Sequence, residues 1–326
     1  MISSVTEIYP PVNLHHIAPL DFSLVREVPD SHAWPQLGSY SSGVEMVPVI
    51  DLNDTNVVKL VGQACETWGV FNITNHGISN CLLEEVESES RRLFSLPSQQ
   101  KLKVLRSPDG ITGYGLPRIS PFFSKIMWHE GFTIRGNVLE EYQKEMKKLA
   151  ERLLSVMVGA LGIAREDVNW ANPLGDEVNG AQTTLQLNSY PACPEPDRAM
   201  GMVPHTDTSL FTILCQSSTS GLQIFRDEVG WLTLPPQTGA LTVNVGDLLH
   251  ILSNARFPSV LHRAIVNNTH HRISTAFFYA PPISAQISPS SRLIDHQAPK
   301  YRSMSCGEYI GIKAKHLEKA LSLVRL

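Results

Sequence analysis

A succession of short apolar or alternating runs constrains the fold of this chain more than any other feature. It begins at Ala181, and glycine, proline and asparagine separate runs such as residues 222–225, 231–234 and 240–243. Runs of this length, bounded by turn residues, are typical of β-strands. Because regularly spaced short strands pack as a sandwich or a barrel, the sequence predicts a mainly β structure here.

The chain before residue 181 has a helical pattern instead. Residues 53–55 predict the N-cap of a first helix, which a strand at residues 70–73 follows. We expect a second helix from Asn80 to Phe94 and a final one near residues 307–324. The apolar stripe of the first helix comprises Val57, Val58, Val61, Cys65 and Trp68. A long packing helix is indicated by apolar residues three and four positions apart, namely Leu139, Tyr142, Met146, Leu149, Leu153, Val156 and Ala160.

Two potential metal ligands, His205 and Asp207, precede an apolar, β-branched run. In extended backbone, residues i and i+2 project to the same side, so both side chains can reach one ion. A histidine and an aspartate at this spacing are also frequent by chance, and an aspartate beside threonine and serine is more often a turn or cap residue. The pair alone therefore leaves a structural role open.

The case for a metal site is strengthened by a further set of residues that lies later in the chain. His262 lies in a strand-like apolar run, where a core histidine is the alternative, and Arg272 and Ser274 share one face of the next run. A guanidinium inside a hydrophobic strand pair needs an anion, either an acidic side chain of the protein or a bound carboxylate. Two imidazoles and one carboxylate hold a divalent iron and leave three neighbouring positions free, so the pattern favours oxygen chemistry.

These residues, together with Asn188 and Tyr190, resemble the motifs of the plant iron(II)- and 2-oxoglutarate-dependent dioxygenases. The resemblance extends from about residue 45 to the carboxyl terminus and includes residues 47–52, 68–78 and 246–249. It implies a mainly β fold with flanking helices, in which an amino-terminal helical region supports a double-stranded β-helix, or jelly-roll, core. The expected units are an arm at 1–44, a helical and strand region at 45–180, the iron and 2-oxoglutarate core at 181–285 and a helical extension at 286–326.

The resemblance also implies the roles of the site residues. The metal ligands would be His205, Asp207 and His262. The residues that bind 2-oxoglutarate would be Arg272, Ser274, Tyr190 and Asn188. Arg272 would also be the catalytic anchor, because it orients the distal carboxylate of the cosubstrate. The implied cofactors are iron(II), 2-oxoglutarate and dioxygen, with ascorbate as the reductant, and the products are succinate, carbon dioxide and a hydroxylated substrate.

Within this family, the chain most resembles the gibberellin 3-oxidases, through five separate stretches whose joint occurrence is more specific than the metal motif. These stretches are residues 26–34, 127–134, 197–201, 245–254 and 313–316. The resemblance implies 3β-hydroxylation of C19 gibberellins to bioactive forms. Phe211, Cys215 and residues 277–280 depart from the usual residues of this group, so a 2-oxidase, a 20-oxidase or an oxidase of mixed regiospecificity stays open.

A gibberellin pocket should be mostly apolar, with a few polar groups for the acid and the lactone. We expect Tyr114 or Lys125 to meet the acid, with a core or surface role as the alternative for each. The expected apolar walls are Met127, Trp128, Phe132 and Phe278. The histidines expected to be structural or exposed are His129, His250, His270 and His271, because none has the spacing of another metal site.

The composition excludes several classes of partner. A formal net charge of -4 leaves no basic surplus for the phosphates of nucleic acid. We recognise no secretory signal and no membrane-spanning run, so we expect a cytosolic monomer that binds neither nucleic acid nor membranes. The 5 cysteines are scattered, which argues against a disulfide framework or a zinc ribbon and suits a reducing compartment that keeps iron ferrous.

Two alternatives without oxygenase activity stay open. The same two histidines and aspartate can bind zinc and activate water for hydrolysis, but Arg272 and Ser274 would then have no function. A silent hormone-binding protein is the second alternative, yet all three metal ligands and the cosubstrate anchor are present. The agreement of these independent features favours the dioxygenase.

Overall fold

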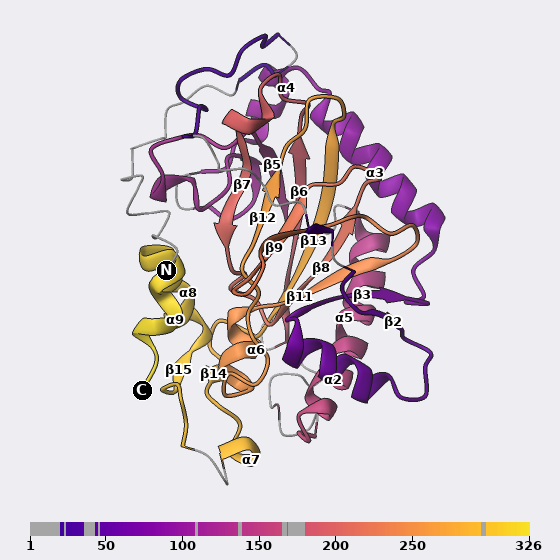
Figure 1. Ribbon diagram of the computed structural model, residues 1–326, viewed down its shortest axis with the longest axis vertical. Helices are drawn as coiled ribbons and strands as arrows, with labels where there is room; N and C mark the ends of the chain where they lie inside the picture. The colour runs from indigo at the N-terminus through magenta and orange to yellow at the C-terminus, as the bar shows by residue number, and fades with distance from the viewer. Residues whose placement is uncertain are drawn as a thin grey trace.

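Two β-sheets form the centre of the computed structural model shown in Figure 1. The structure describes residues 20–22, 24–35, 43–44, 46–107, 110–135, 139–164, 168, 180–294 and 298–326. Most of the arm expected at residues 1–44 therefore lies outside the described residues. The described part of it packs on the protein, since Val28 and Trp34 are buried and the Trp34 indole donates to the Ile126 carbonyl at 3.1 Å.

The two large sheets confirm the jelly-roll core. In order across the sheet, the larger one comprises β2 (Val49–Asp51), β3 (Val70–Thr74), β11 (Leu241–Val245), β8 (Phe211–Gln216), β13 (Arg272–Ala280), β6 (Gln182–Tyr190), β5 (Glu130–Ile134) and β4 (Gly113–Gly115). The smaller one comprises β1 (Gly43–Val44), β10 (Gly230–Leu234), β9 (Leu222–Arg226), β12 (His262–Ile265) and β7 (Met200–His205). A short separate pair consists of β14 (Gln286–Ile287) and β15 (Met304–Ser305).

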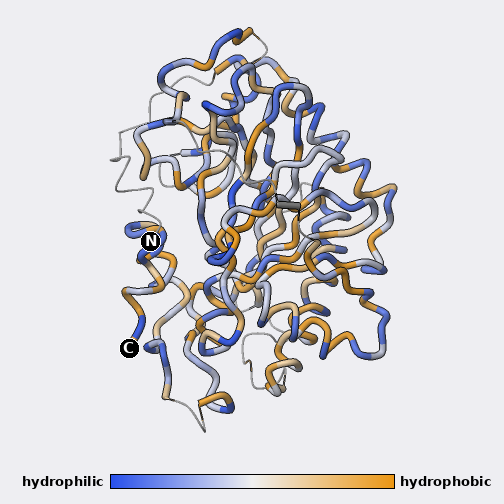
Figure 2. The backbone as a smooth tube through the Cα atoms, viewed as in Figure 1, coloured by the Kyte–Doolittle hydropathy of each residue, from blue (hydrophilic) through white to orange (hydrophobic). Residues whose placement is uncertain are grey.

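Three helices support the outer face of the larger sheet, as Figure 1 shows. They are α2 (Val57–Thr67), α3 (Asn80–Phe94) and α5 (Glu140–Ala160). Orange and blue segments alternate along α3 in Figure 2, as expected of a helix with one buried face. Shorter helical elements are α4 (Ser98–Lys101), η1 (Leu102–Val104), η2 (Ser120–Phe122), η5 (Pro196–Arg198), α6 (Asp247–Leu252) and α7 (Ser291–Ile294). No helix in the described ranges is both long and apolar enough to cross a bilayer.

Side chains of β13 point alternately into the hydrophobic core and toward the site. Ile273, Phe277 and Tyr279 are buried in the core that includes apolar residues of α5. Their neighbours Ser274 and Phe278 instead line a cavity between the sheets. Because successive side chains of a strand point to opposite faces, one strand both anchors the helices and forms a wall of the cavity.

The predicted helices have mixed outcomes. The second helix and the long helix are confirmed as α3 and α5. The cap predicted at residues 53–55 is wrong, because α2 begins at Val57 after Asn56, which makes no side-chain capping bond. The Asp54 carboxylate accepts from the Asn56 amide at 2.7 Å, so it closes a turn before the helix. Val58 is also misplaced in the predicted stripe, since 42% of it is exposed.

The single helix predicted near residues 307–324 is wrong as well. The structure has α8 (Cys306–His316), the 3-10 turn η6 (Leu317–Lys319) and α9 (Ala320–Leu323). The break lies at Leu317, whose φ of 44° is incompatible with a right-handed helix. The Leu317 side chain is buried in a cluster with Trp34, Phe123 and Met127, so tertiary packing favours the break.

Candidate active site

A cavity of about 400 Å³ lies between the two sheets and is closed on one side by α8. We call it the central cavity. Its polar lining includes His205, Asp207, His262, Arg272, Ser274 and Asn188. Its apolar lining includes Met202, Leu214, Leu222, Ala276, Phe278 and Leu317. The structure thus brings the predicted metal and cosubstrate residues to one enclosed space.

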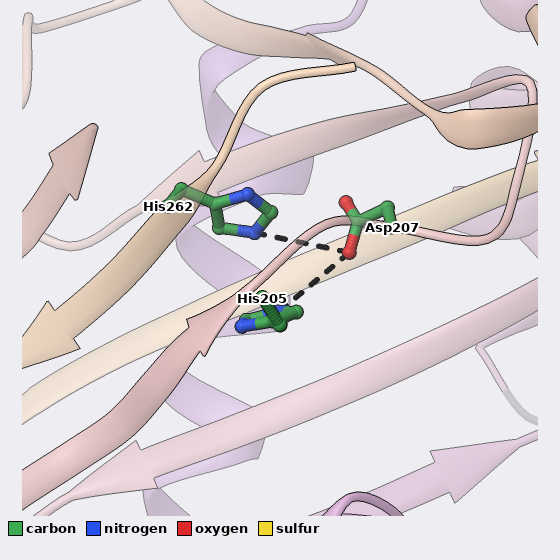
Figure 3. Close-up of side chains that lie close together, drawn as sticks. All are labelled: His205, Asp207 and His262. Carbon is green, nitrogen blue, oxygen red and sulfur yellow. Dashed lines mark ion pairs between the residues drawn. The ribbon is translucent and has the colours of Figure 1, made fainter. Parts of the chain in front are cut away.

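Strand pairing brings the two histidines of the metal-ligand set together. The set consists of His205, Asp207 and His262, whose potential ligand atoms all lie within 4.8 Å of one another. His205 ends β7 and pairs directly with His262, the first residue of β12. Asp207 follows β7 in a loop, and its Oδ1 lies 3.7 Å from His205 Nε2 and 3.8 Å from His262 Nε2. Figure 3 shows the three side chains pointing toward one another.

Hydrogen bonds orient each member of the metal-ligand set. The Nδ1 of His205 lies 2.8 Å from the Val203 carbonyl, and the Nδ1 of His262 lies 3.0 Å from the Val260 carbonyl. Because a carbonyl only accepts, both rings carry their proton on Nδ1, and each Nε2 keeps its lone pair. The Thr212 hydroxyl donates to Asp207 Oδ2 at 2.6 Å, which leaves Oδ1 toward the imidazoles.

This arrangement fits a divalent cation. Two donor atoms that are each about 2.1 Å from one ion lie at most about 4.2 Å apart, and both His–Asp distances are shorter than that. Burial lowers the pKa of His205 to about 4, and the neighbouring His262 adds to the shift. His205 is therefore neutral at pH 7, the form that binds a metal. Two imidazoles and a carboxylate are the donors expected for iron(II) with open coordination positions.

Arg272 is a buried cation without an acidic partner in the described part of the chain. It is 2% exposed, and burial lowers the pKa of its guanidinium. Its Nη2 donates to Gln216 Oε1 at 2.8 Å and its Nη1 to Ser274 Oγ at 3.4 Å, whereas its Nε has no hydrogen-bond partner among the described residues. Its guanidinium carbon lies 5.0 Å from the Tyr190 ring centroid. A buried charge of this kind requires an anion, so the site fits a carboxylate ligand.

Asn188 and Tyr190 lie beside this guanidinium because of the register of β6 and β13. Arg272 pairs with Tyr190, and Ser274 pairs with Asn188. His129 completes the group, since its Nε2 lies 3.0 Å from Asn188 Oδ1 and its ring centroid lies 5.0 Å from that of Tyr190. Burial lowers the pKa of His129 to about 4.

His129 was not predicted to belong to the cavity wall. We expected a structural or exposed histidine; the imidazole is buried, with 1% exposed, and it also lines the central cavity. Its position just before β5 is the only signal in the sequence that places it near Tyr190. That signal depends on the pairing of β5 with β6, which local sequence does not specify.

A second buried network joins α8 to the metal-ligand loop. Lys313 of α8 donates to Asp247 Oδ2 and to the Thr206 hydroxyl, both at 2.6 Å. Tyr309 donates to the same carboxylate at 2.7 Å. The Asp247 amide donates to the Asp207 carbonyl at 2.8 Å, so the network holds the backbone beside a metal ligand. Lys313 also lines the central cavity.

The residues expected to contact the substrate are not gathered in one place. Phe278 lines the central cavity. The others lie outside its lining, namely Tyr114, Lys125, Met127, Trp128 and Phe132. Tyr114 is buried and donates to Glu130 Oε2 at 2.7 Å, and Lys125 donates to the Asp30 carbonyl at 2.6 Å. The two groups expected to meet the acid are therefore bound elsewhere.

Comparisons with known families match both halves of the chain. The model of the 2OG-Fe(II) oxygenase superfamily matches residues 181–281. The model described as the N-terminal region of non-haem dioxygenases in morphine synthesis matches residues 47–152. The first range contains the metal-ligand set and Arg272, and the second contains α2, α3 and β5.

Curated relatives and solved structures extend over nearly the whole chain. Gibberellin 3-beta-dioxygenase 1 of Pisum sativum is 48% identical and covers 97% of this chain and 91% of its own length. Gibberellin 3-beta-dioxygenase 2 of Arabidopsis thaliana is 46% identical and covers 100% of both. The crystal structure of JOX2 in complex with 2OG, Fe and JA has a TM-score of 0.82 at 28% identity, covering 97% of this chain and 98% of that one.

Proposed function

Because the chain belongs to the 2OG-Fe(II) oxygenase superfamily, we propose that it hydroxylates a C19 gibberellin at the 3β position in the central cavity. The observation that carries this proposal is the near full-length identity of 46% to 48% with gibberellin 3-beta-dioxygenases of two plants. A second observation supports it: one cavity holds both the metal-ligand set and Arg272, which has no acidic partner among the described residues.

His205, Asp207 and His262 hold the iron in this proposal. Each imidazole offers Nε2 because its Nδ1 proton is bound to a backbone carbonyl, and Asp207 offers Oδ1 because Thr212 occupies Oδ2. When bound, iron(II) and 2-oxoglutarate supply the oxidising chemistry that converts substrate, dioxygen and 2-oxoglutarate into hydroxylated product, succinate and carbon dioxide. Three protein ligands leave positions for the cosubstrate and dioxygen.

Arg272 binds the distal carboxylate of 2-oxoglutarate with its planar guanidinium. Gln216 and Ser274 hold the guanidinium, and the unpartnered Nε is a donor still to be satisfied. Tyr190 packs on the cation, and Asn188 lies between the anchor and His129. Holding the distal carboxylate in this way would set the orientation of the cosubstrate.

The apolar residues of the central cavity enclose the ring skeleton and exclude water. Phe278, Met202 and Leu317 come from three separate elements, so the wall surrounds the substrate from several sides. Such a lining suits a rigid diterpenoid, whose burial gives binding energy without a specific contact for each carbon. The substrate carbon that faces the iron then decides the position of hydroxylation.

Product identification tests the proposal. Purified protein is incubated with iron(II), ascorbate, 2-oxoglutarate and a C19 gibberellin that lacks the 3-hydroxyl, and the products are identified by mass spectrometry against standards. We expect the 3β-hydroxylated gibberellin together with an equal amount of succinate. Hydroxylation only at carbon 2, or oxidation at carbon 20 of a C20 precursor, would instead assign the protein to another class of gibberellin oxidase. Absence of gibberellin turnover across a substrate panel would refute the assignment.

The proposal also includes a monomer in a reducing compartment such as the cytosol. All five cysteines lie in the described ranges and are free thiols. A reducing environment keeps both these thiols and the ferrous ion reduced, and ascorbate reduces iron that has been oxidised without turnover. Light scattering of the purified protein and fractionation of plant cells test these two points.

A further inference from the structure

Lys313 is a buried cation of α8 that contacts the backbone segment between two metal ligands. It is 7% exposed, and its Nζ donates to Asp247 Oδ2 and to Thr206 Oγ1, both at 2.6 Å. Thr206 is the single residue between His205 and Asp207 in the sequence. We call Lys313, Asp247 and Thr206 the α8 bridge, and α8 is drawn in yellow in Figure 1.

The hydrogen bonds of the α8 bridge form a closed ring with the metal-ligand loop. The Asp247 amide donates to the Asp207 carbonyl at 2.8 Å, and the Asp247 carboxylate accepts from Lys313. Lys313 in turn donates to Thr206, which precedes Asp207 in the chain. The ring therefore joins three separate segments, namely α8, the start of α6 and the loop after β7. It holds two neighbouring residues of that loop.

Glycine at position 246 lets the start of α6 approach this loop. A Cβ there would overlap the Ser209 carbonyl and would lie 3.1 Å from the Asp207 carbonyl oxygen. The Leu248 amide also donates to the Ser209 carbonyl at 3.2 Å. Because backbone packs directly on backbone, the loop has little room to shift relative to α6. The remaining freedom of the loop is limited by the contact of Thr206 with α8.

The carboxylate of the α8 bridge is fully buried and has all its partners. Asp247 is 0% exposed, its Oδ1 accepts from Ser259 at 2.7 Å, and its Oδ2 accepts from Tyr309 at 2.7 Å as well as from Lys313. Burial raises the pKa of Tyr309, and the charge of Asp247 adds to the shift, so the phenol stays a donor. Moving Lys313 away would leave a buried charge unpaired, which keeps the ammonium in place.

The face of α8 that carries Lys313 also forms a wall of the central cavity. Ile310, Lys313 and Ala314 all line the cavity, and so does Leu317 just after the helix. Residues three and four positions apart share one face of a helix, so these side chains form one surface. One side chain of the substrate wall therefore reaches the loop that carries two of the metal ligands.

We propose that Lys313 is a positioning residue of the iron site, which fixes Thr206 between two ligands and thereby makes iron binding and the docking of α8 strengthen each other. This inference rests on the proposed function, since it takes iron as the ion that the metal-ligand set holds. Lys313 acts through Thr206 and not by touching the metal. The coupling is reciprocal, because a docked α8 that raises the iron affinity is itself stabilised by bound iron to the same extent.

Four variants separate positioning from a general role in packing. Thr206→Val removes the hydroxyl that accepts from the ammonium, and Lys313→Met removes the ammonium but keeps an unbranched side chain. Tyr309→Phe removes a hydrogen bond to the same carboxylate without changing the contact with Thr206. Lys315→Met is the control, because Lys315 is an exposed lysine of the same helix. Each metal-free protein is checked for folding by circular dichroism and titrated with iron(II) without oxygen.

We expect Thr206→Val to raise the Kd for iron(II) about threefold or more and Lys313→Met about tenfold or more, because groups that orient metal ligands affect metal affinity on this scale. The double variant should bind iron as weakly as Lys313→Met alone, since both changes remove the same contact. Tyr309→Phe and Lys315→Met should stay within about twofold of the wild type, an effect below about 0.4 kcal/mol. If Lys313→Met does not fold, the comparison of Thr206→Val with Tyr309→Phe decides the question.

Hydrogen exchange tests the reciprocal effect in α8. Iron(II) should slow amide exchange in the peptide that covers residues 306–316 of the wild type, because bound metal favours the docked helix. The same addition should have no effect on this peptide in Thr206→Val. Neither measurement depends on turnover of a substrate.

Failure of this inference differs from failure of the proposed function. A wild-type Kd for iron(II) in folded Thr206→Val, an equal loss of affinity in Tyr309→Phe, or losses that multiply in the double variant overturn the positioning role of Lys313. Unchanged exchange in α8 of the wild type overturns it as well. All of these outcomes leave gibberellin hydroxylation standing. Conversely, the expected iron affinities in a protein that turns over no gibberellin support the role of Lys313 and refute the proposed function.

Discussion

The backbone carbonyls of Val203 and Val260 decide which nitrogen each metal-binding histidine offers. Each carbonyl accepts the Nδ1 proton of the histidine two residues further along the chain, so the same local geometry occurs at both histidines. The imidazoles are thereby oriented before any ion arrives, which reduces the entropy that binding must overcome.

Replacing His205 by alanine tests the metal-ligand set. His205→Ala should bind iron(II) at least tenfold more weakly and give no detectable hydroxylation, because two ligands cannot replace three. Metal content after dialysis and product formation are measured. His270→Ala, at an exposed histidine, is the control and should keep both. Full activity of His205→Ala would mean that the ligand assignment is wrong.

Arg272→Lys tests the cosubstrate anchor. An ammonium keeps the charge but loses the planar fork that binds a carboxylate through two parallel bonds. We expect the KM for 2-oxoglutarate to rise about tenfold or more, equivalent to about 1.4 kcal/mol. Succinate formation against 2-oxoglutarate concentration measures this. An unchanged KM would assign the cosubstrate carboxylate to another residue.

Tyr142 offers a test of stability that is independent of function. Its hydroxyl on α5 is buried without a hydrogen-bond partner among the described residues, and its side chain is 1% exposed. Burying a hydroxyl without a partner costs about 1–3 kcal/mol, so Tyr142→Phe should leave the free energy of unfolding unchanged or raise it by about 1 kcal/mol. Urea unfolding measures the change, and a loss of more than 1 kcal/mol would reveal a partner for the hydroxyl.

At the level of elements, the buried carboxylate of Glu130 connects β5 to α4 and β4. Glu130 of β5 accepts from Lys101 of α4 at 2.6 Å and from Tyr114 of β4 at 2.7 Å. It thus ties two short elements to a strand of the larger sheet. The segment that carries Arg106 lies between α4 and β4, so this carboxylate also holds a part of the chain that lines the central cavity.

Glu130→Gln should therefore be costly. Breaking a buried ion pair by removing one partner typically costs about 3–5 kcal/mol, and both side chains are only 9% exposed. Glu87→Gln is the control, since its pair with Arg91 is 35% to 39% exposed and should contribute less than about 1 kcal/mol. Urea unfolding of both variants distinguishes the two cases. Equal losses would mean that Lys101 finds another partner.

The sequence predicts those elements whose pattern is local. The apolar spacing of α3 and α5 and the i, i+2 pairs at the site are visible over a few residues. The break at Leu317 was not predictable, because packing against Trp34 and Phe123 imposes it. The hydrogen bond of Tyr114 was not predictable for the same reason, since its partner Glu130 lies on another strand. The pairing of His205 with His262 likewise required the whole sheet.

At the scale of the whole molecule, buried neutral histidines make stability depend on pH. Burial lowers the pKa of His32, His129 and His271 from 6.5 to about 4. Between pH 6.5 and about 4, the unfolded chain therefore binds protons that the folded chain does not. The free energy of unfolding should be greatest above pH 6.5 and fall as the pH is lowered through this window. Urea unfolding from pH 7.5 to 4.5 measures it, and a flat profile would contradict the burial of these rings.

The position of α8 in the sequence means that the wall of the central cavity is synthesised after the metal ligands. All three metal ligands have been made once residue 262 is added, whereas Lys313 and Leu317 of the cavity wall are added after them. A ribosome that stops before residue 306 thus releases a product with its ligands present and one side of the chamber missing. Water would then reach the metal-ligand set from the side that α8 closes in the folded protein.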